Sequence, residues 1–194
     1  MSKKFDQAIE KIDAENAKDP ESERDGQTAV PKALLYSRRM TECLDRFAPG
    51  APEYLKLAAR AQHIRRWDIP RDTFPRDRAG YHVWRTRLYS HHAEVTATIL
   101  QGVGYSDDTI SRVKDLLMKR RIKSDPDMQT LEDVICLVFM THYFDDFAAS
   151  HDDHKLITIL RRTWGKMSDK GHDAALKLDF SERAQALIET ALEG

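Results

Sequence analysis

The chain has 194 residues, of which 41% are hydrophobic and 32% charged, so it is long enough for one ordinary domain with a sizeable core. No apolar run approaches the roughly 20 residues that a membrane span needs, and the charged N-terminal segment has no apolar signal-peptide region, so we expect a cytoplasmic protein. The net charge of −1 argues against a general nucleic-acid binder, which would show a clear basic excess. Cys43 and Cys136 lie far apart in helical apolar patterns, which predicts buried thiols rather than a disulfide.

The N-terminal half is expected to be helical, with two loops. Phe5, Ile9 and Ile12 recur at helical spacing, which predicts a short helix over residues 4–18. Residues 19–30 read as a polar loop. A proline in the first turn then opens each of two helices, over residues 31–47 and 52–67. A long loop rich in Arg and Pro follows over residues 68–80, and loops of such length are often functional.

The C-terminal half continues the helical pattern. A long helix over residues 80–104 ends in glycine, and Ser106 is expected to cap the next helix. After a turn at residues 124–127, the predicted helices cover residues 128–150 and 152–168, and one or two short helices close the chain. No segment shows sustained alternation of the strand type. The predicted fold class is therefore all-α, a single domain of seven to nine helices over residues 1–194.

The segment over residues 61–85 carries an unusual set of charges. It holds six arginines, three aspartates and no lysine, so its net charge is +3 and the rest of the chain carries −4. A local positive charge on a nearly neutral protein suits a small anion better than a polymer. Arginine presents a planar fork that holds phosphate or sulfate with two hydrogen bonds, and it stacks on aromatic rings. The alternative is a set of surface ion pairs between these arginines and the interleaved aspartates.

The helix over residues 52–67 is apolar on two opposite sides, which predicts a central position. Its last turns nevertheless carry Gln62, His63, Arg65 and Arg66, and buried polar or charged groups need partners or a ligand. We therefore expect these four residues to lie at a binding site.

Two further helices supply candidates. Tyr81, Arg85 and His92 lie within about 40° of one another on one flank of the helix over residues 80–104, whereas His91 reads as a core residue. The apolar "VICLVFM" helix carries Glu132 and Asp133 in its expected first turn. Carboxylates there interact favourably with the helix dipole. Alternatively, Asp133 is the partner of His63 or of an arginine.

Several motifs together resemble domain-of-unknown-function family 4202: "LLYSRRM", "LAARAQHIRRWDIPR", "RAGYHVWR", "SDPDMQTLEDVICLVF" and "TWGKMSDKGH". The resemblance extends over nearly the whole chain, from about Phe5 to Leu178. The family's name carries no activity, so the resemblance implies little about function.

A more distant resemblance concerns the fold. "LKLAARAQHIRRWDIP" and "HHAEVTATIL" look like the helices of HD-type metal phosphohydrolases, which implies a distantly HD-like domain. In that alignment Gln62 stands at a metal-binding histidine and His63 at the metal-binding aspartate. Tyr36 falls near the first histidine ligand and Lys119 at a later one. The usual metal set is therefore mostly lost, and a rebuilt set of His63, His92, Glu94 and Asp133 would suit a divalent transition metal.

These observations predict a hydrolase acting on a phosphorylated or nucleotide-like small molecule. In this hypothesis His63, Asp133 and His92 are catalytic, and the anion is bound by Gln62, Arg65, Arg66, Arg85, Lys119 and Tyr81. The alternative is a non-catalytic protein that binds a nucleotide, phosphate or sulfate ester. RNA binding through arginines and aromatic rings is a third and weaker hypothesis. No membrane partner is expected, and a homodimer is left open.

The segment of Thr163, Trp164, Lys166 and Ser168 near the C-terminus has two interpretations. Lysine near a helix C-terminus commonly interacts with the helix dipole, and Trp164 is more often a core residue than a stacking ring. The functional interpretation brings Lys166 or His172 to the same cleft.

Overall fold

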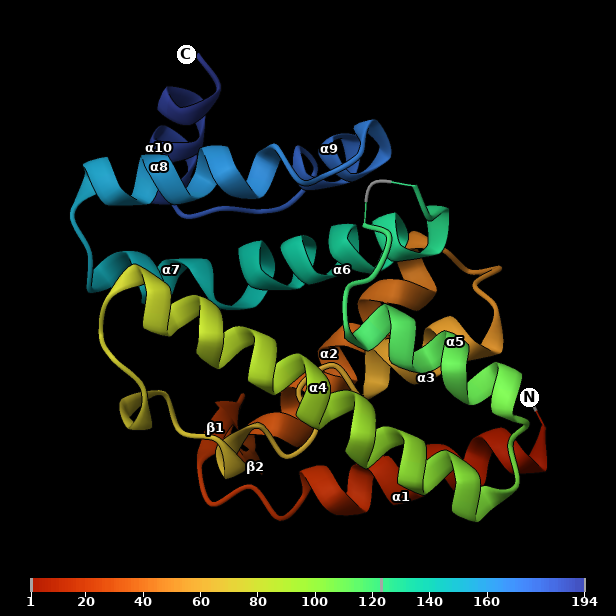
Figure 1. Ribbon diagram of the computed structural model, residues 1–194. Helices are drawn as coiled ribbons and strands as arrows, with labels where there is room; N and C mark the ends of the chain where they lie inside the picture. The colour runs from red at the N-terminus through yellow and green to blue at the C-terminus, as the bar shows by residue number, and fades with distance from the viewer. Residues whose placement is uncertain (1, 123, 194) are drawn as a thin grey trace. The chain divides into compact units, whose positions relative to one another are not determined.

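The computed structural model describes residues 2–122 and 124–193 of the chain, and these residues are mostly helical (Figure 1). They fall into two compact units, Met1–Met128 and Gln129–Gly194. The described residues form ten α-helices, one or more beyond the seven to nine that we expected. The difference arises because predicted helices are interrupted, as the individual elements show.

Unit 1 contains five complete helices, two 3-10 turns and a hairpin. Its elements are α1 (Lys3–Asn16), β1 (Ser22–Asp25), β2 (Thr28–Pro31), α2 (Lys32–Phe47), α3 (Glu53–Arg60), η1 (Arg66–Asp68), η2 (Arg71–Thr73), α4 (Arg78–Val103) and α5 (Asp107–Leu117).

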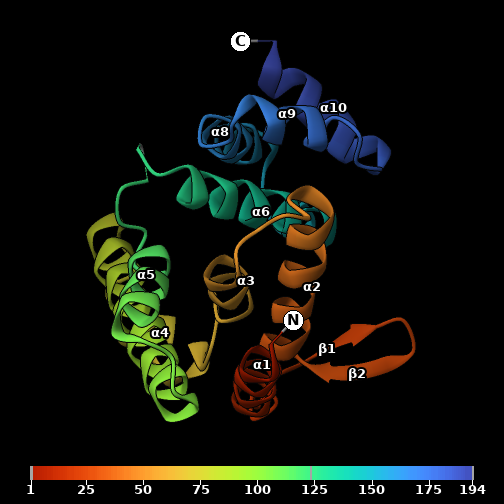
Figure 2. The same cartoon turned by 90° about the vertical axis from the view of Figure 1, so that its right-hand side faces the viewer.

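Helix α3 is the central element of unit 1. It packs against α1, α2 and α5, and Figure 2 shows it between α2 and α5. Leu55, Leu57, Ala58 and Ala59 are each at most 1% exposed although they lie on different sides of the helix. The prediction of a central helix that is apolar on two sides is therefore confirmed for residues 53–60.

The expected polar loop at residues 19–30 contains a small antiparallel hairpin, so the prediction of a loop without strands was wrong. Strands β1 and β2 pair from Ser22–Pro31 to Asp25–Thr28, and Gly26 opens the turn with φ +61°. A glycine adopts this left-handed conformation without the cost of a Cβ atom. The strands show no alternation because only Val30 of their residues is buried, and most of the others are exposed. A hairpin without a buried face leaves no periodic signal.

Helix α6 (Pro126–His142) crosses from one unit to the other, and unit 2 continues with α7 (Phe144–Ala149), α8 (Asp153–Trp164), α9 (Asp169–Ala175) and α10 (Glu182–Leu192). Helix α8 packs against α10. The expected single helix over residues 128–150 is interrupted at Tyr143, whose φ of −129° and ψ of −16° are not helical. Helix α6 also begins at Pro126, so Glu132 and Asp133 lie beyond its first turn, contrary to the prediction.

In the part of the chain that the structure describes, no helix combines the length and the apolar character needed to cross a membrane. Cys43 and Cys136 are both buried, and neither forms a disulfide bond within the described residues, as predicted. Burial raises the pKa of the Cys43 thiol to about 11.

Candidate anion-binding site

The residues after α3 form a strained turn rather than the helix that we predicted through Trp67. Helix α3 ends at Arg60, and Arg65 adopts a left-handed conformation with φ 50° and ψ 38°. This conformation costs a non-glycine residue about 1–2 kcal/mol, so other contacts must stabilise it. The turn carries Gln62, His63 and Arg66, three of the predicted site residues.

Helix α4 supplies the contacts that stabilise this turn. The Nδ1 atom of His92 lies 2.7 Å from the carbonyl oxygen of Ile64, and Nε2 of His91 lies 3.2 Å from that of Arg65. Because a carbonyl oxygen only accepts, both nitrogens carry their protons and donate. The indole Nε1 of Trp84 donates to the carbonyl of Ile69 over 2.9 Å. In a longer α3 these carbonyl oxygens would accept hydrogen bonds from backbone amides of the same helix. Here they accept from side chains of α4 instead, and these side chains stabilise the non-helical turn.

The loop between the turn and α4 also approaches α4 closely. Gly80 lies so near Pro75 that a Cβ atom at Gly80 would stand 2.2 Å from the Pro75 carbonyl oxygen. The Arg71 guanidinium donates to the carbonyls of Phe74 and Pro75 at 3.0 and 2.7 Å. One of the six arginines therefore closes the loop itself.

His63 is the central candidate. Its ring stacks on Tyr36, with centroids 3.8 Å apart and planes at 15°, and the His92 ring lies 6.1 Å away. Neither ring nitrogen of His63 has a hydrogen-bond partner among residues 2–122 and 124–193. Burial, followed by the charge of Arg66, the neighbouring His92 and the charge of Lys119, holds the pKa of His63 well below its usual value. The imidazole is therefore neutral at neutral pH.

Three cations and three aromatic rings surround this turn. The Arg66 guanidinium lies 4.8 Å from the centroid of the Trp84 ring. Arg85 lies 5.6 Å from the Tyr81 ring and 5.5 Å from the Tyr89 ring, and it also donates a hydrogen bond to the Tyr89 hydroxyl. The Lys119 ammonium lies 5.6 Å from the Tyr89 ring. Together with the stacked pair of Tyr36 and His63, these six residues form what we call the Arg66 cluster: Tyr36, His63, Arg66, Tyr81, Trp84, Arg85, Tyr89 and Lys119.

Arg66 differs from its sequence neighbour Arg65 in its surroundings. Among the described residues it forms no ion pair, and its contact is the face of Trp84. Burial is the main cause that lowers its pKa from the ordinary value, and the charge of Arg85 acts in the same direction. Arg65, by contrast, pairs with Asp68 at 2.8 Å and with Glu15 at 3.7 Å. The charge of Arg65 is compensated within unit 1, so Arg66 is the better candidate for binding an anion.

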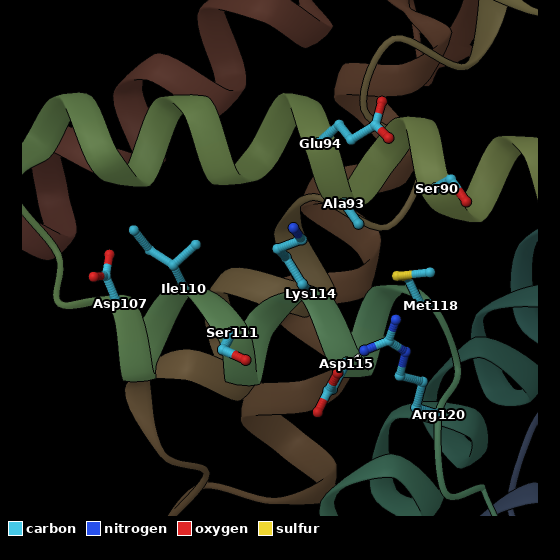
Figure 3. Close-up of a pocket in the computed structure, with 10 residues that line it drawn as sticks. All are labelled: Ser90, Ala93, Glu94, Asp107, Ile110, Ser111, Lys114, Asp115, Met118 and Arg120. Carbon is cyan, nitrogen blue, oxygen red and sulfur yellow. Dashed lines mark hydrogen bonds and ion pairs between the residues drawn. The ribbon is translucent and has the colours of Figure 1, made fainter.

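Two other predicted residues lie in unit 1. Gln62 is 4% exposed, and its side-chain oxygen Oε1 is buried without a hydrogen-bond partner in the described chain. Glu94 is exposed on α4 and lines a separate pocket of about 380 Å³ (Figure 3). Glu94 therefore belongs to a different surface from His92, whose ring is buried and faces the turn.

The pocket in Figure 3 lies between α4 and α5 and carries charges of both signs. Its carboxylates are Glu94, Asp107 and Asp115, and its cations are Lys114 and Arg120. Arg120 pairs with Asp115 at 2.9 Å. The charges of this pocket nearly balance, so it lacks the net positive charge expected of an anion site.

Asp133 lies in unit 2, where its carboxylate orders the start of α9. The carboxylate is 2% exposed and accepts hydrogen bonds from the Ser168 amide at 2.8 Å, the Ser168 hydroxyl at 2.5 Å and the Gln129 side chain at 3.1 Å. A Cβ atom at Gly171 would stand 2.6 Å from its Oδ1. The predicted catalytic role of Asp133 beside His63 stays a prediction, because these bonds explain its burial without that role.

The rest of the C-terminal segment is also ordered by contacts within unit 2. The Trp164 and His172 rings stack with centroids 4.0 Å apart, and Nε2 of His172 lies 2.9 Å from the Trp164 carbonyl oxygen. The Lys166 ammonium lies 3.9 Å from the buried Glu132 carboxylate. Trp164 is half-buried rather than a core residue, and its contact with His172 holds it within unit 2.

Replacing Asp133 with Asn is expected to destabilise unit 2 by about 1–3 kcal/mol, because an amide NH₂ would face the Ser168 donors and leave a buried donor unpaired. The matched control is Asp173→Asn on α9, an exposed aspartate expected to change stability by less than about 0.5 kcal/mol. Urea unfolding followed by tryptophan fluorescence measures both. Equal effects of the two substitutions would contradict the role of Asp133.

The predicted metal set receives no support from side-chain geometry. Within the described ranges, no three His, Cys, Asp or Glu side chains are grouped so that they could hold a metal ion. The Nδ1 atom of His92 is occupied by the Ile64 carbonyl, and Glu94 lines another surface.

The Arg66 cluster contains residues that the sequence analysis did not predict as site residues. Trp84 and Tyr89 were missed as site residues. The spacing of Arg85 and Tyr89, four residues apart on one helix, is a signal that could have indicated their contact. The position of Trp84 beside Arg66 carries no such signal, because the two residues lie on different elements.

Comparison with known proteins identifies one family. The model of the family described as "Domain of unknown function (DUF4202)" matches residues 6–188, which includes nearly all of both units. No curated protein and no solved structure matches the chain.

Proposed function

The chain belongs to the DUF4202 family, and we propose that its Arg66 cluster binds the phosphoryl group of a phosphorylated or nucleotide-like small molecule, which the protein hydrolyses. The family description states no activity, so the proposal rests on the chemistry of the site.

The observation that carries the proposal is a half-buried guanidinium without an anionic partner. Arg66 lies against Trp84 and forms no ion pair within the described part of the chain. Removing a cation from water is costly unless a counter-charge compensates it, so a bound anion would stabilise this arrangement. Guanidinium groups bind phosphate oxygens with two parallel hydrogen bonds, and rings hold the guanidinium plane in position. Lys119 and Arg85 add positive charge around the same turn.

The resemblance to HD-type phosphohydrolases contributes to the proposal only by pointing to residues that align with metal ligands of those enzymes. That resemblance aligns Tyr36, His63 and Lys119 with metal-ligand positions of those enzymes. Tyr36 stacks on His63, and Lys119 lies near enough to lower the pKa of His63. This proximity supports a distantly HD-like site in which cations and a neutral imidazole replace the metal ligands.

A second candidate function is anion binding without turnover. It is favoured by the uncompensated charge of Arg66, which needs a ligand but not a reaction. Release of inorganic phosphate from a panel of phosphate esters and nucleotides would support the hydrolase. Thermal stabilisation by the same compounds without any product would support the binding protein.

The Arg66→Lys variant is expected to bind inorganic phosphate about tenfold more weakly than the wild type, because lysine presents a single point charge and loses the bidentate geometry. The matched control is Arg24→Lys, an exposed arginine in β1. Calorimetric titration with phosphate and with sulfate, together with thermal-shift curves, measures the effect. Equal losses at Arg66 and Arg24 would refute the proposed site.

A further inference from the structure

We propose that His63 is a phosphoryl acceptor, which takes the phosphoryl group from the substrate as a covalent intermediate and then transfers it to water. The inference rests on the proposed function, and it goes further by assigning the reacting atom to the imidazole ring of His63.

His63 is held in position while its ring nitrogens remain available. The ring stacks on Tyr36 at 3.8 Å, and the turn that carries it is fixed by the bond from His92 to the Ile64 carbonyl. No residue of the described ranges occupies either ring nitrogen of His63. A nucleophile needs a free lone pair and a fixed direction of approach, and His63 has both.

Two cations, Arg66 and Lys119, act on the ring of His63. The protonated imidazole is disfavoured mainly by burial and further by the charges of Arg66 on η1 and Lys119 after α5, so the lone pair is available at neutral pH. The same two cations would stabilise the negative charge of the phosphoryl group while it is transferred. Arg66 and Lys119 would therefore both keep the His63 imidazole neutral and stabilise the phosphoryl group that it attacks.

The two neighbouring histidines, His91 and His92, use ring nitrogens in other contacts. Nδ1 of His92 donates to the Ile64 carbonyl, and Nε2 of His91 faces both the Arg65 carbonyl and the Asp68 carboxylate, each at 3.2 Å. His91 and His92 are thus positioning residues for the turn. His63 is the histidine of this group whose nitrogens both remain unbonded.

The chemistry balances without a further reactant. One nitrogen of the neutral imidazole attacks phosphorus, the bond from phosphorus to the ester oxygen breaks, and the leaving oxygen takes a proton from water. The other ring nitrogen keeps its proton. Water then attacks the phosphorus, the bond between nitrogen and phosphorus breaks, the water's proton passes to solvent, and neutral His63 returns with inorganic phosphate released.

The experiment uses p-nitrophenyl phosphate as the phosphoryl donor and alkaline quenching, because phosphohistidine survives alkali and is lost in acid. Intact-mass and peptide mass spectrometry of the full chain is expected to find one phosphoryl group on His63. In His63→Asn, a variant of similar size, the label is expected to disappear and turnover to fall more than about hundredfold, while inorganic phosphate still binds. The control His154→Asn, at an exposed histidine of α8, is expected to retain the label.

The outcomes separate this inference from the proposed function. Phosphate binding with no covalent label, or with a label on another residue, overturns the role of His63 and leaves the anion site standing. Failure of the wild type to bind phosphate overturns both. A label on His63 that His63→Asn abolishes supports both.

Discussion

Lowering the pH from 6.5 to 4 is expected to reduce the free energy of unfolding by about 3 kcal/mol through His92 alone, because each pH unit is worth about 1.4 kcal/mol per differential proton. Burial is the main cause that lowers the pKa of His92 from 6.5 to about 3. The unfolded chain therefore binds a proton below about pH 6.5, whereas the folded chain does not until about pH 3. More protons bind to the unfolded state in this window, so stability falls as the pH falls.

His92→Asn is the variant that tests this linkage. Asparagine keeps an N–H donor near the position of Nδ1, so it is expected to retain the bond to the Ile64 carbonyl, and it does not titrate. Urea unfolding between pH 8 and pH 4 should therefore show a shallower loss of stability than in the wild type. A residual slope is expected from His63, whose lowered pKa acts in the same direction. His154→Asn, at an exposed histidine, is the control, and a slope in His92→Asn equal to that of the wild type would contradict the prediction.

Gly80→Ala is expected to destabilise unit 1 by about 1–3 kcal/mol, the usual cost of forcing extra atoms into a packed site. The added Cβ atom would stand 2.2 Å from the Pro75 carbonyl oxygen and 2.9 Å from its carbonyl carbon and Cβ. Because most of these atoms are backbone, the loop over residues 70–77 must move away from α4. Phosphate binding is expected to weaken as well, since this loop follows directly from the turn that carries Arg66.

Gly102→Ala provides the control within the same helix. A Cβ atom at Gly102 meets nothing within 4 Å, so alanine is expected to stabilise α4 by about 0.5–1 kcal/mol through its better helix propensity. Guanidinium unfolding and phosphate titration of the two variants would be compared. Destabilisation of the same size in both, or none in Gly80→Ala, would show that the close approach to Pro75 is unimportant.

The fold was predictable wherever a local pattern decides it. The apolar residues of α3 indicated a central helix, and the side chain of Ser106 caps α5 as predicted by accepting from the Thr109 amide. The end of α3 was not predictable, because the histidines that hold the turn lie more than 20 residues later on α4. The exposed β1–β2 hairpin and the interruption at Tyr143 likewise have no periodic signal.

In the candidate site too, contacts within one helix could be predicted from the sequence, whereas contacts between different elements could not. The contact between Arg85 and Tyr81 followed from helical spacing, whereas the pairing of Arg65 with Asp68 and Glu15 required the turn and α1. Adjacent arginines therefore received different environments, one neutralised and one stacked on Trp84. Composition alone suggested an anion site but could not separate Arg65 from Arg66.

The positive-φ residues of this chain have a consequence for how its sequence tolerates change. The non-glycine residues with φ above zero in the described ranges are Arg65, Lys119 and Arg121, and all three are basic. Glycine is the substitution that relieves such backbone strain, and here it would always remove a positive charge. At Lys119, mutations that ease the backbone would weaken the cluster around His63. Selection for stability alone would therefore erode this site, and its persistence in a lineage would require selection for the cation.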